Sequence, residues 1–282
     1  MNELIVDQES LLYDYLRKNV KGSKNNIKSL LTKEMITVNG KTVTKYNYEL
    51  KKGDKIKIGA KKIESSYGNI SIIYEDKDFL VVDKKSGILT IATEEDKNST
   101  NNLYSILLSY MKKRNSNSKL FVVHRLDKDT SGVVLFVKNK ILQEKLQENW
   151  NTIAKRIYYA VVNGITKKEE TLTSYLKEDD NLMTHKSDEK NGKLSITKYK
   201  MIKHNDNYSL LEIEIKTGRR NQIRVQLKDI NHPLVGDSKY GKDKKNKRLM
   251  LHASLLTIKN PLNNKEYTFE SKLDKSFYDF VK

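Results

Sequence analysis

The 282-residue chain contains no cysteine, only two prolines, and no long unbroken apolar run. Without cysteine there are no disulfides, no thiolate metal ligands and no cysteine nucleophile. A membrane-spanning helix needs about 20 consecutive apolar residues, and the mean hydropathy of this chain is −0.70. The first segment, MNELIVDQESLLYDYLRK, carries charges where a secretory signal requires an apolar core. We therefore expect a cytoplasmic protein with no membrane contact.

Metal-binding patterns are also missing from the sequence. The five histidines show neither an HxH nor an HExxH spacing. Nothing in the sequence points to a site built from distant histidine and aspartate residues either. We therefore predict no metal site.

Charge of one sign is abundant, with 54 Lys and Arg against 36 Asp and Glu, a net charge of +18. Such an excess favours a polyanionic partner, with nucleic acid first and an acidic membrane surface second. Simple enrichment in lysine produces the same number, so charge alone does not decide between these interpretations.

Residues 1–60 predict a small basic α+β domain. Apolar residues recur at helical spacing around Leu12 and again around Leu30. The segment ITVNGKTVT (36–44) places two β-prone runs around Asn-Gly, the pair favoured in two-residue hairpin turns. An alternating strand, KIKI (55–58), follows. Residues 1–62 hold 14 Lys and Arg against 7 Asp and Glu, so this part of the chain is strongly basic.

This order of parts resembles the S-four-type RNA-binding domain, a small module named after a ribosomal protein. Such a module would grip structured RNA through its backbone and shape. The alternative is any small basic α+β unit. Residues 61–69 are polar and predict a linker, so the second domain is expected at 70–282.

Residues 70–282 predict an α+β domain, because many strand-like runs alternate with few helical segments. Helical spacing appears at 102–113 and 141–150. Strands are expected at ISIIYE (70–75), FLVVD (79–83), FVVH (121–124), VVLFV (133–137), IYYAVV (157–162), YSLLEIEI (208–215) and LLTI (255–258). The pattern favours a mostly antiparallel or mixed sheet.

The segment HRLDKDTSG (124–132) places several ionisable residues between two apolar strands. In an extended segment alternate residues share a face, so Arg125 and Asp127 are expected to point together, with Leu126 opposed. A carboxylate beside an arginine is expected to stay ionised. Taken alone, the pattern RxD is more typical of an ion pair at a strand end.

The whole nonapeptide resembles the HRLDxxTSG pattern of the RluA-type family of RNA pseudouridine synthases. Further segments match the family in its order: RIYYAVVNG (156–164), SITKY (195–199), TGRRNQIRVQL (217–227), NHPLVGDSKYG (231–241) and RLMLHA (248–253). The resemblance covers the chain from about residue 70. It implies the pseudouridine synthase fold, with a central mixed or antiparallel sheet.

The resemblance also implies roles for single residues. Asp127 matches the catalytic aspartate of the family. Tyr158 matches the tyrosine that stacks near the target uracil and helps to remove the proton from its carbon-5. Arg224 matches the arginine that pairs with the catalytic carboxylate. For substrate binding we add three residues of the same motifs: Arg125, Arg219 and Gln222.

The chain departs from the family pattern at a few positions. Arg220 and Asn221 stand where the family usually has Thr-His, Gln226 replaces a histidine, and Lys85 replaces a proline. None of these positions is expected to carry the central chemistry. We expect them to affect RNA contacts and loop rigidity, or to mark a different target site.

The expected reaction breaks the bond between the ribose and a ring nitrogen of uracil. The ribose is then rejoined to carbon-5 of the same base. It involves no redox change and no external group, so we expect no cofactor and no metal. A carboxylate suits this task as a nucleophile or as a base, and the sequence leaves both roles open.

The expected partner is RNA, with large-subunit ribosomal RNA favoured by family analogy and transfer RNA as the second pool. A non-catalytic RNA-binding or ribosome-assembly protein of the same fold is the alternative. It is disfavoured because Asp127, Tyr158 and Arg224 are all present. A nuclease is also disfavoured, because the sequence shows no cluster of the metal ligands that a two-metal nuclease needs. We expect no DNA partner, and a monomer by default.

Overall fold

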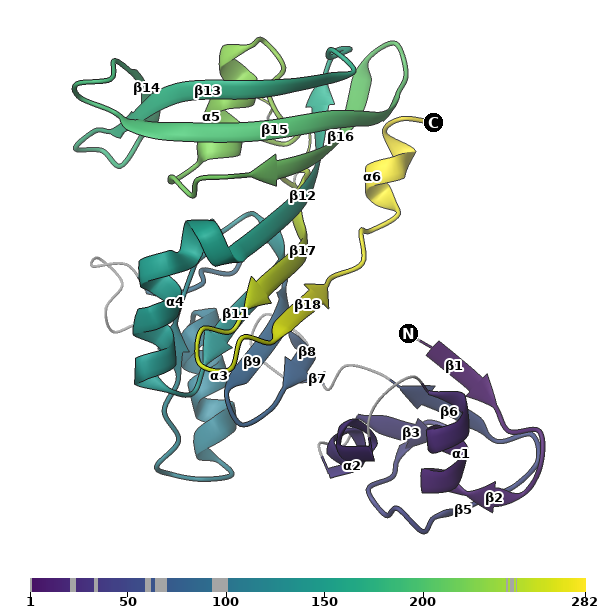
Figure 1. The fold of residues 1–282 in the computed structure, drawn as a ribbon. Helices are drawn as coiled ribbons and strands as arrows, with labels where there is room; N and C mark the ends of the chain where they lie inside the picture. Colours follow the sequence, from purple (N-terminus) through teal and green to yellow (C-terminus); the bar gives the residue numbers. More distant parts are fainter. Residues whose placement is uncertain are drawn as a thin grey trace.

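The computed structural model describes residues 2–20, 24–32, 35–58, 62–63, 70–92, 101–241, 243, 246 and 248–282 (Figure 1). The helices are α1 (Leu12–Asn19), α2 (Lys24–Thr32), α3 (Leu103–Lys112), α4 (Lys140–Ile153), α5 (Gln222–Asp229) and α6 (Ser276–Asp279). The first strands are β1 (Asn2–Ile5), β2 (Ser10–Leu11), β3 (Ile36–Val38), β4 (Lys41–Thr42), β5 (Glu49–Leu50), β6 (Lys55–Ile58) and β7 (Lys62–Ile63). The remaining strands are β8 (Ile70–Glu75), β9 (Phe79–Lys84), β10 (Phe121–Val122), β11 (Ser131–Val137), β12 (Ala154–Asn163), β13 (Glu169–Glu178), β14 (Thr184–Ser187), β15 (Lys193–His204), β16 (Tyr208–Ile215), β17 (Leu251–Lys259) and β18 (Glu266–Glu270).

The N-terminal residues form the elements that the sequence predicts. Helices α1 and α2 pack on a sheet of order β1-β6-β3-β4 around a core of their own. The hairpin β3–β4 turns at Asn39 and Gly40, which both have positive φ as a tight two-residue turn requires. The interpretation of this unit as an S-four-type RNA-binding domain stays a prediction.

The predicted linker, residues 61–69, is described only in part. Residues 62 and 63 form β7, which pairs antiparallel with β8, the first strand of the larger sheet. Residues 61 and 64–69 lie outside the described residues. The domain bounds 1–60 and 70–282 remain predictions.

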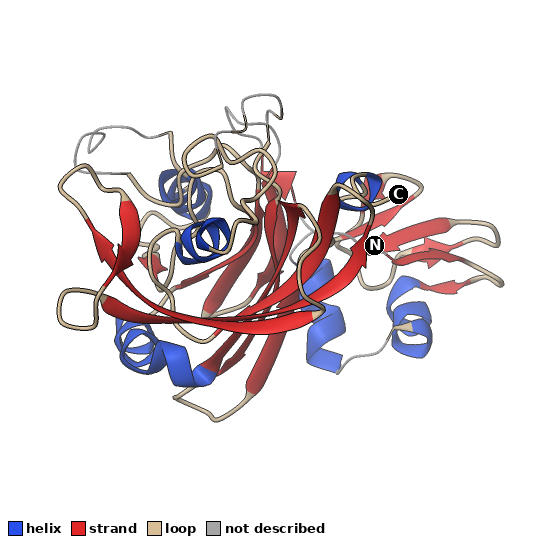
Figure 2. Cartoon of the chain, turned by 90° about the horizontal axis from the view of Figure 1, so that it is seen from above, coloured by secondary structure: helices blue, strands red, loops and turns tan. Residues whose placement is uncertain are grey.

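In the described part of the chain, twelve strands form one large sheet. Its main order is β14-β13-β15-β16-β12-β17-β11-β9-β8-β7, with β10 beside β11 and β18 beside β17. All neighbours are antiparallel except β11 and β17, which run parallel. Figure 2 shows helices on both sides of this sheet. The predicted α+β class with a mixed sheet is therefore confirmed.

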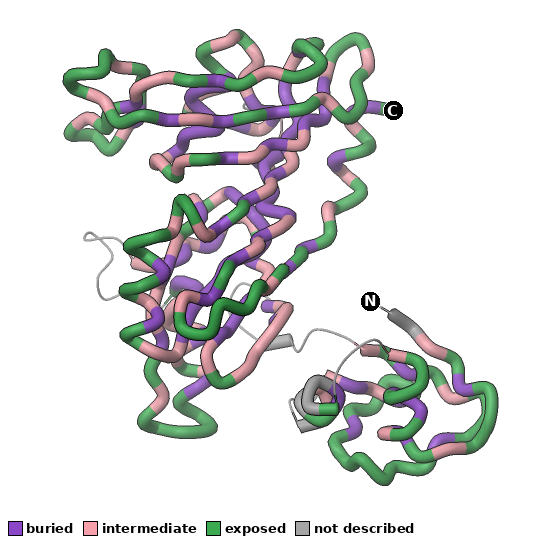
Figure 3. The backbone as a smooth tube through the Cα atoms, viewed as in Figure 1, coloured by how far each residue is buried: buried purple, intermediate pink, exposed green. Residues whose placement is uncertain are grey.

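The lower half of the sheet in Figure 1 is buried on both faces. Alternate residues of β9 and β11 enter two different cores, one shared with α3 and the other with α4 and β18. This explains why VVLFV and FLVVD read as unbroken apolar runs. Figure 3 shows the buried residues gathered along these central strands, with a separate group in the N-terminal unit.

The short strands β1, β2, β5 and β7 were not predicted from the sequence, and neither were β13, β14, β15 and β18. The last four are rich in charged and polar residues, and in β15 buried positions alternate with exposed ones. A strand that is solvated on one face carries few apolar residues, so its pattern is weak. The predicted helices at 102–113 and 141–150 correspond to α3 and α4.

Gly132 allows β11 and β17 to approach each other closely. Its φ is +116°, and a Cβ there would lie 2.1 Å from the carbonyl oxygen of Ala253. The parallel contact places the start of β11, which is the Ser131-Gly132 end of HRLDKDTSG, beside β17 and thus one strand from β12. None of the described helices is long and apolar enough to cross a membrane.

Candidate active site

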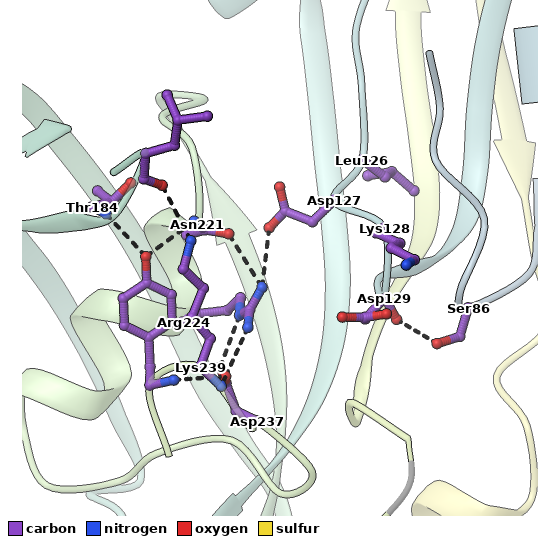
Figure 4. A network of polar contacts seen from close by, with 12 residues as sticks. Ser86, Leu126, Asp127, Lys128, Asp129, Thr184, Asn221, Arg224, Asp237 and Lys239 are labelled. Carbon is purple, nitrogen blue, oxygen red and sulfur yellow. Dashed lines mark hydrogen bonds and ion pairs between the residues drawn. The ribbon is translucent and has the colours of Figure 1, made fainter. Parts of the chain in front are cut away.

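The segment HRLDKDTSG forms the turn between β10 and β11. The carbonyl oxygen of Asp127 accepts a hydrogen bond from the amide of Thr130 at 3.2 Å, which closes the turn. Leu126 belongs to the main core, and it lines one cavity together with Arg125 and Asp127. Figure 4 shows the side chains of Leu126 and Asp127 pointing away from each other, as the sequence predicts for these two residues.

Side chains of the loop after β9 form hydrogen bonds with the backbone of this turn. Thr90 Oγ1 donates to the carbonyl oxygen of Leu126 at 2.8 Å and accepts from its amide at 3.2 Å. Ser86 Oγ donates to the carbonyl oxygen of Asp129 at 2.7 Å. The backbone on both sides of Asp127 is thus fixed by side chains of the loop.

Lys84 anchors the loop and the turn together. Its buried ammonium donates to three carbonyl oxygens, of Lys85 at 3.1 Å, Ile88 at 2.7 Å and Lys128 at 2.8 Å. Burial lowers the pKa of Lys84 to about 7, while the nearby carboxylates of Asp129 and Asp127 oppose the shift. Three acceptors suit the three N–H bonds of the charged form.

A cavity of about 340 Å³ opens beside Asp127. Its wall combines the turn, the end of α4, β12 and the start of α5. The lining includes all six predicted site residues: Arg125, Asp127, Tyr158, Arg219, Gln222 and Arg224. The fold therefore brings together motifs that lie up to a hundred residues apart in the sequence.

Arg224 is held by two carboxylates at unequal distances (Figure 4). Its Nε and Nη2 donate to Asp237 at 2.8 and 2.7 Å, a bidentate pair, whereas its Nη1 lies 3.8 Å from Oδ2 of Asp127. The Asp237 side chain is fully buried, and that of Asp127 is 23% exposed. The main charge partner of Arg224 is therefore Asp237, and Asp127 is a looser second partner that faces the cavity.

Asn221 and Tyr240 complete the surroundings of Arg224. Asn221 Oδ1 accepts a hydrogen bond from Arg224 Nη1 at 3.2 Å, and its Nδ2 donates to the Tyr240 hydroxyl at 3.0 Å. The guanidinium lies over the Tyr240 ring, 5.1 Å from its centroid. Asn221 begins α5 in the left-handed region, with φ 51°, which asparagine tolerates.

Burial dominates the electrostatics of the two predicted catalytic groups. It raises the pKa of the Asp127 carboxyl above its usual value, against the opposing effect of Arg224 and then Arg125. Arg224 and Arg125 lower the pKa of Asp127, as expected of neighbouring cations, but burial has the larger effect. Burial also raises the pKa of Tyr158 to about 12, so its phenol is neutral near pH 7.

The three residues predicted for substrate binding differ in how far their side chains are exposed and free of contacts within the protein. Arg125 is exposed at the rim of the cavity. Arg219 is half-buried, and its Nε donates to the carbonyl oxygen of Leu194. The Gln222 amide is buried and bonded to protein on both sides, at Thr217 and Thr197. Its geometry is that of a residue that positions the loop before α5.

The departures from the family pattern have different surroundings. Asn221 accepts a hydrogen bond from Arg224, so this departure borders the predicted catalytic residues. Gln226 points away from the cavity and ties α5 to the sheet through Ser174 and the carbonyl oxygen of Ser195. Arg220 pairs with Glu178 at 3.1 Å beside a second cavity of about 420 Å³. Lys85 is exposed.

Sequence reasoning missed Asp237, Lys84 and Arg156 as parts of the site. Asp237 and Arg156 lie in the quoted segments NHPLVGDSKYG and RIYYAVVNG, and Lys84 directly precedes Lys85. The need for a carboxylate to balance a buried Arg224 is the signal that would have led to Asp237. Within the described residues, no group of three or more His, Asp or Glu side chains is arranged to hold a metal ion.

Comparison with known proteins places this site in a family. The family model described as RNA pseudouridylate synthase matches residues 78–229. An uncharacterised RNA pseudouridine synthase of Bacillus subtilis, YhcT, is 32% identical over 90% of this chain and 86% of its own length. Ribosomal large subunit pseudouridine synthase C of Rickettsia bellii is 34% identical over 77% of this chain and 72% of its own.

Solved structures show the same fold. Human RNA pseudouridylate synthase domain containing 1 superposes with a TM-score of 0.61 at 24% identity, covering 76% of this chain and 88% of its own. Together with the HRLDKDTSG turn and its cavity, these matches confirm the resemblance noted in the sequence. The chain belongs to the RluA-type family of RNA pseudouridine synthases, which are isomerases.

Proposed function

We propose that this synthase converts specific uridines of large-subunit ribosomal RNA to pseudouridine, with Asp127 as the reacting carboxylate. The observation that carries the role of Asp127 is its place in the cavity beside Arg224, whose charge is mainly balanced by Asp237. Two relatives named as ribosomal large subunit pseudouridine synthases, C of Rickettsia bellii and D of Salmonella typhimurium, support the choice of RNA. With that substrate class, the cytoplasm is the expected location.

The reaction breaks the bond from ribose carbon-1′ to uracil nitrogen-1 and forms a bond from carbon-1′ to carbon-5. The proton on carbon-5 is lost and nitrogen-1 gains one, so atoms balance without a co-reactant. Asp127 can act as the nucleophile or as the base only when it is ionised. Arg224 at 3.8 Å favours the ionised form, and the longer distance leaves a carboxylate oxygen available to the substrate.

Tyr158 forms the aromatic wall of the cavity. A stacked or paired uridine must leave its helix to reach Asp127, at a cost of a few kcal/mol. Stacking of the base on an aromatic ring returns about 1–3 kcal/mol. The phenol of Tyr158 is neutral near pH 7, and burial raises its pKa further, to about 12, so the ring offers the base an uncharged aromatic face.

The remaining contacts come from the cavity rim and the N-terminal unit. Arg125 and Arg219 carry charge suited to phosphates, while Gln222 holds the loop before α5 in place. The basic residues of 1–60 grip structured RNA away from the reacting uridine, in the manner of an S-four-type domain. The protein works as a monomer in this scheme.

The test is tritium release from RNA labelled at uridine carbon-5. Total ribosomal and transfer RNA from cells that lack the protein are incubated with the wild-type chain, with Asp127→Asn, and with Asp129→Asn as matched control. Asp129 lies in the same turn but does not line the cavity. We expect release from ribosomal RNA by the wild type and Asp129→Asn, and none by Asp127→Asn, although this variant still binds RNA.

Other outcomes reject parts of the proposal. Release from transfer RNA alone would replace the substrate class. Turnover by Asp127→Asn would remove Asp127 from the chemistry. Binding of RNA by the wild type without release from either pool would favour a non-catalytic RNA-binding protein.

A further inference from the structure

Arg156, on β12, is a buried cation on the wall of the active-site cavity. It is 5% exposed and lines the cavity with Tyr158. Its Nη2 donates to Asn151 Oδ1 and to the carbonyl oxygen of Lys216, both at 3.1 Å. Its Nε is buried without a hydrogen-bond partner. Within the described residues no carboxylate lies within ion-pair distance of Arg156.

The lack of a counter-charge near Arg156 contrasts with the surroundings of Arg224. Both guanidinium groups line one cavity, but Arg224 has Asp237 and Asp127 as counter-charges. A buried charge without a partner is expensive, and burial lowers the pKa of Arg156. Guanidinium nevertheless stays protonated in proteins. The two N–H groups of Nη1 are therefore left for an acceptor that the described protein does not supply, whereas Nε has almost no exposed surface.

The space in front of Arg156 is kept open by a glycine. A Cβ at Gly218 would lie 2.9 Å from Arg156 Nη1, too close for an unmoved guanidinium. Arg156 and Tyr158 are both buried, whereas Ile157 between them is more exposed. Arg156 and Tyr158 therefore share one face of β12. Two residues along a strand span about 6.5 Å, the order of the separation between a nucleotide's base and its phosphate.

We propose that Arg156 receives the phosphate of the target uridine while Tyr158 stacks on its base, an inference that rests on the proposed function. A guanidinium fork binds phosphate oxygens with paired charge-assisted hydrogen bonds. The cost of burying Arg156 is then offset only when RNA occupies the cavity. This contact favours the extruded nucleotide over the stacked one, and selects a nucleotide over a free nucleoside.

The first test measures kcat/KM for tritium release from ribosomal RNA as a function of salt. Each lost phosphate contact to single-stranded nucleic acid lowers the slope of log affinity against log salt by about 0.7. We expect Arg156→Gln to lower kcat/KM about 10- to 100-fold at low salt and to flatten the slope by that amount. Arg156→Lys should retain the slope. An unchanged slope in Arg156→Gln overturns the proposal, because a merely structural role would lower activity alone.

Lys155→Gln is the matched control. Lys155 neighbours Arg156 on β12 but is exposed and does not line the cavity. The Lys155→Gln substitution removes the same charge from the same strand. We therefore expect kcat/KM and its dependence on salt to stay near the wild-type values. Loss of slope in Lys155→Gln equal to that in Arg156→Gln would show a general charge effect and reject the specific site.

A second measurement needs no turnover. Trp150 is the only tryptophan of the chain and lines the cavity, so its fluorescence reports occupancy in the full chain. We expect uridine 5′-monophosphate to bind at least about tenfold more tightly than uridine, and the two to bind equally in Arg156→Gln. Gly218→Ala, which displaces the guanidinium without removing it, should reduce the same preference.

These measurements separate the two proposals. Equal binding of the nucleotide and the nucleoside by the wild type rejects the phosphate site, whether or not RNA is turned over. A nucleotide preference that depends on Arg156, without tritium release from any RNA, rejects the proposed substrate and keeps the phosphate site.

Discussion

Asp237 holds Arg224 in a buried bidentate ion pair, with distances of 2.7 and 2.8 Å. Asp237 itself is fixed: its Oδ1 also accepts hydrogen bonds from the amides of Lys239 and Tyr240. Arg224 is thus a rigid cation aimed at Asp127 from 3.8 Å. The carboxylate that faces the cavity is thus stabilised by a nearby positive charge without forming a close ion pair.

The first prediction concerns Asp237→Asn. The substitution keeps the shape of the side chain but leaves the buried Arg224 without its main counter-charge. Breaking a buried pair in this way costs about 3–5 kcal/mol of unfolding free energy. Arg224 should then move towards Asp127, so we also expect kcat to fall at least about tenfold through misplacement. Denaturant unfolding and tritium release measure the two effects.

Asp274→Asn serves as control for that prediction. Asp274 is exposed and lies 3.9 Å from Arg248, a surface pair of the kind that contributes at most about 1 kcal/mol. If Asp237→Asn were no less stable than Asp274→Asn, the structural role given to Asp237 would be wrong.

Much of this fold is visible in the sequence because the central strands are buried on both faces. The runs at β9 and β11 are continuous and apolar, and β12 and β16 contain shorter apolar stretches, so these strands are easily recognised. The polar strands β13 and β15 bury only two or three residues each and left no clear signal. The N-terminal hairpin was predictable from Asn39-Gly40, because few other pairs accept two positive φ angles.

The site was predicted residue by residue only where a motif carries it. Asp127, Tyr158 and Arg224 lie together in the cavity as the resemblance implies, and their roles stay proposals. The preference of Arg224 for Asp237 depends on which carboxylate the fold brings closest, which a sequence does not reveal. The unpaired charge of Arg156 is likewise a property of its three-dimensional surroundings.

A second prediction uses the pH dependence of activity. Burial raises the pKa of Asp127, and Arg125 is among the cations that oppose this shift. Arg125→Gln should therefore raise the pKa of Asp127 further. Because the reacting form is ionised, the acidic limb of kcat/KM should move to higher pH. A pH profile of tritium release measures this shift.

The neighbouring Lys128→Gln is the control for the pH profile, because Lys128 is also exposed but is not among the groups that shift Asp127. Its acidic limb should coincide with that of the wild type. An Arg125→Gln profile that is lower at every pH but not displaced would show that Arg125 acts through RNA contacts alone.

A third prediction concerns Lys84→Met, which removes the donor for three carbonyl oxygens, of which that of Ile88 is in a buried hydrogen bond. We expect a loss of at least about 2 kcal/mol in unfolding free energy, because each buried unsatisfied acceptor costs about 1–3 kcal/mol. Activity should fall as well, since the turn that carries Asp127 loses its anchor at Lys128. Denaturant unfolding and tritium release test both effects, and an unchanged stability would refute the anchoring role.

Lys84 also predicts a pH dependence of stability. Its pKa is lowered from 10.5 to about 7 in the folded chain. Between these pH values the unfolded chain binds a proton that the folded chain does not. Its contribution to stability should therefore rise with pH in that window, by at most about 1.4 kcal/mol per pH unit. The difference in unfolding free energy between the wild type and Lys84→Met should grow from pH 7 upwards. A constant difference would mean that the three carbonyl oxygens keep the ammonium charged.

The last prediction concerns the N-terminal unit. A chain shortened to residues 61–282 keeps the whole cavity but loses most of the 14 Lys and Arg of residues 1–62. We expect KM for ribosomal RNA to rise at least about tenfold, and the salt dependence of binding to weaken, because fewer phosphates are contacted. The rate at saturating RNA should change little, since none of the described residues of the unit lines the cavity. Equal turnover of the short and full chains at low RNA concentration would contradict a role in RNA binding.

The full chain with Lys51→Gln and Lys52→Gln, two exposed residues of the unit, tests whether charge alone accounts for the effect. If it does, this double variant should reproduce part of the rise in KM while the unit stays folded.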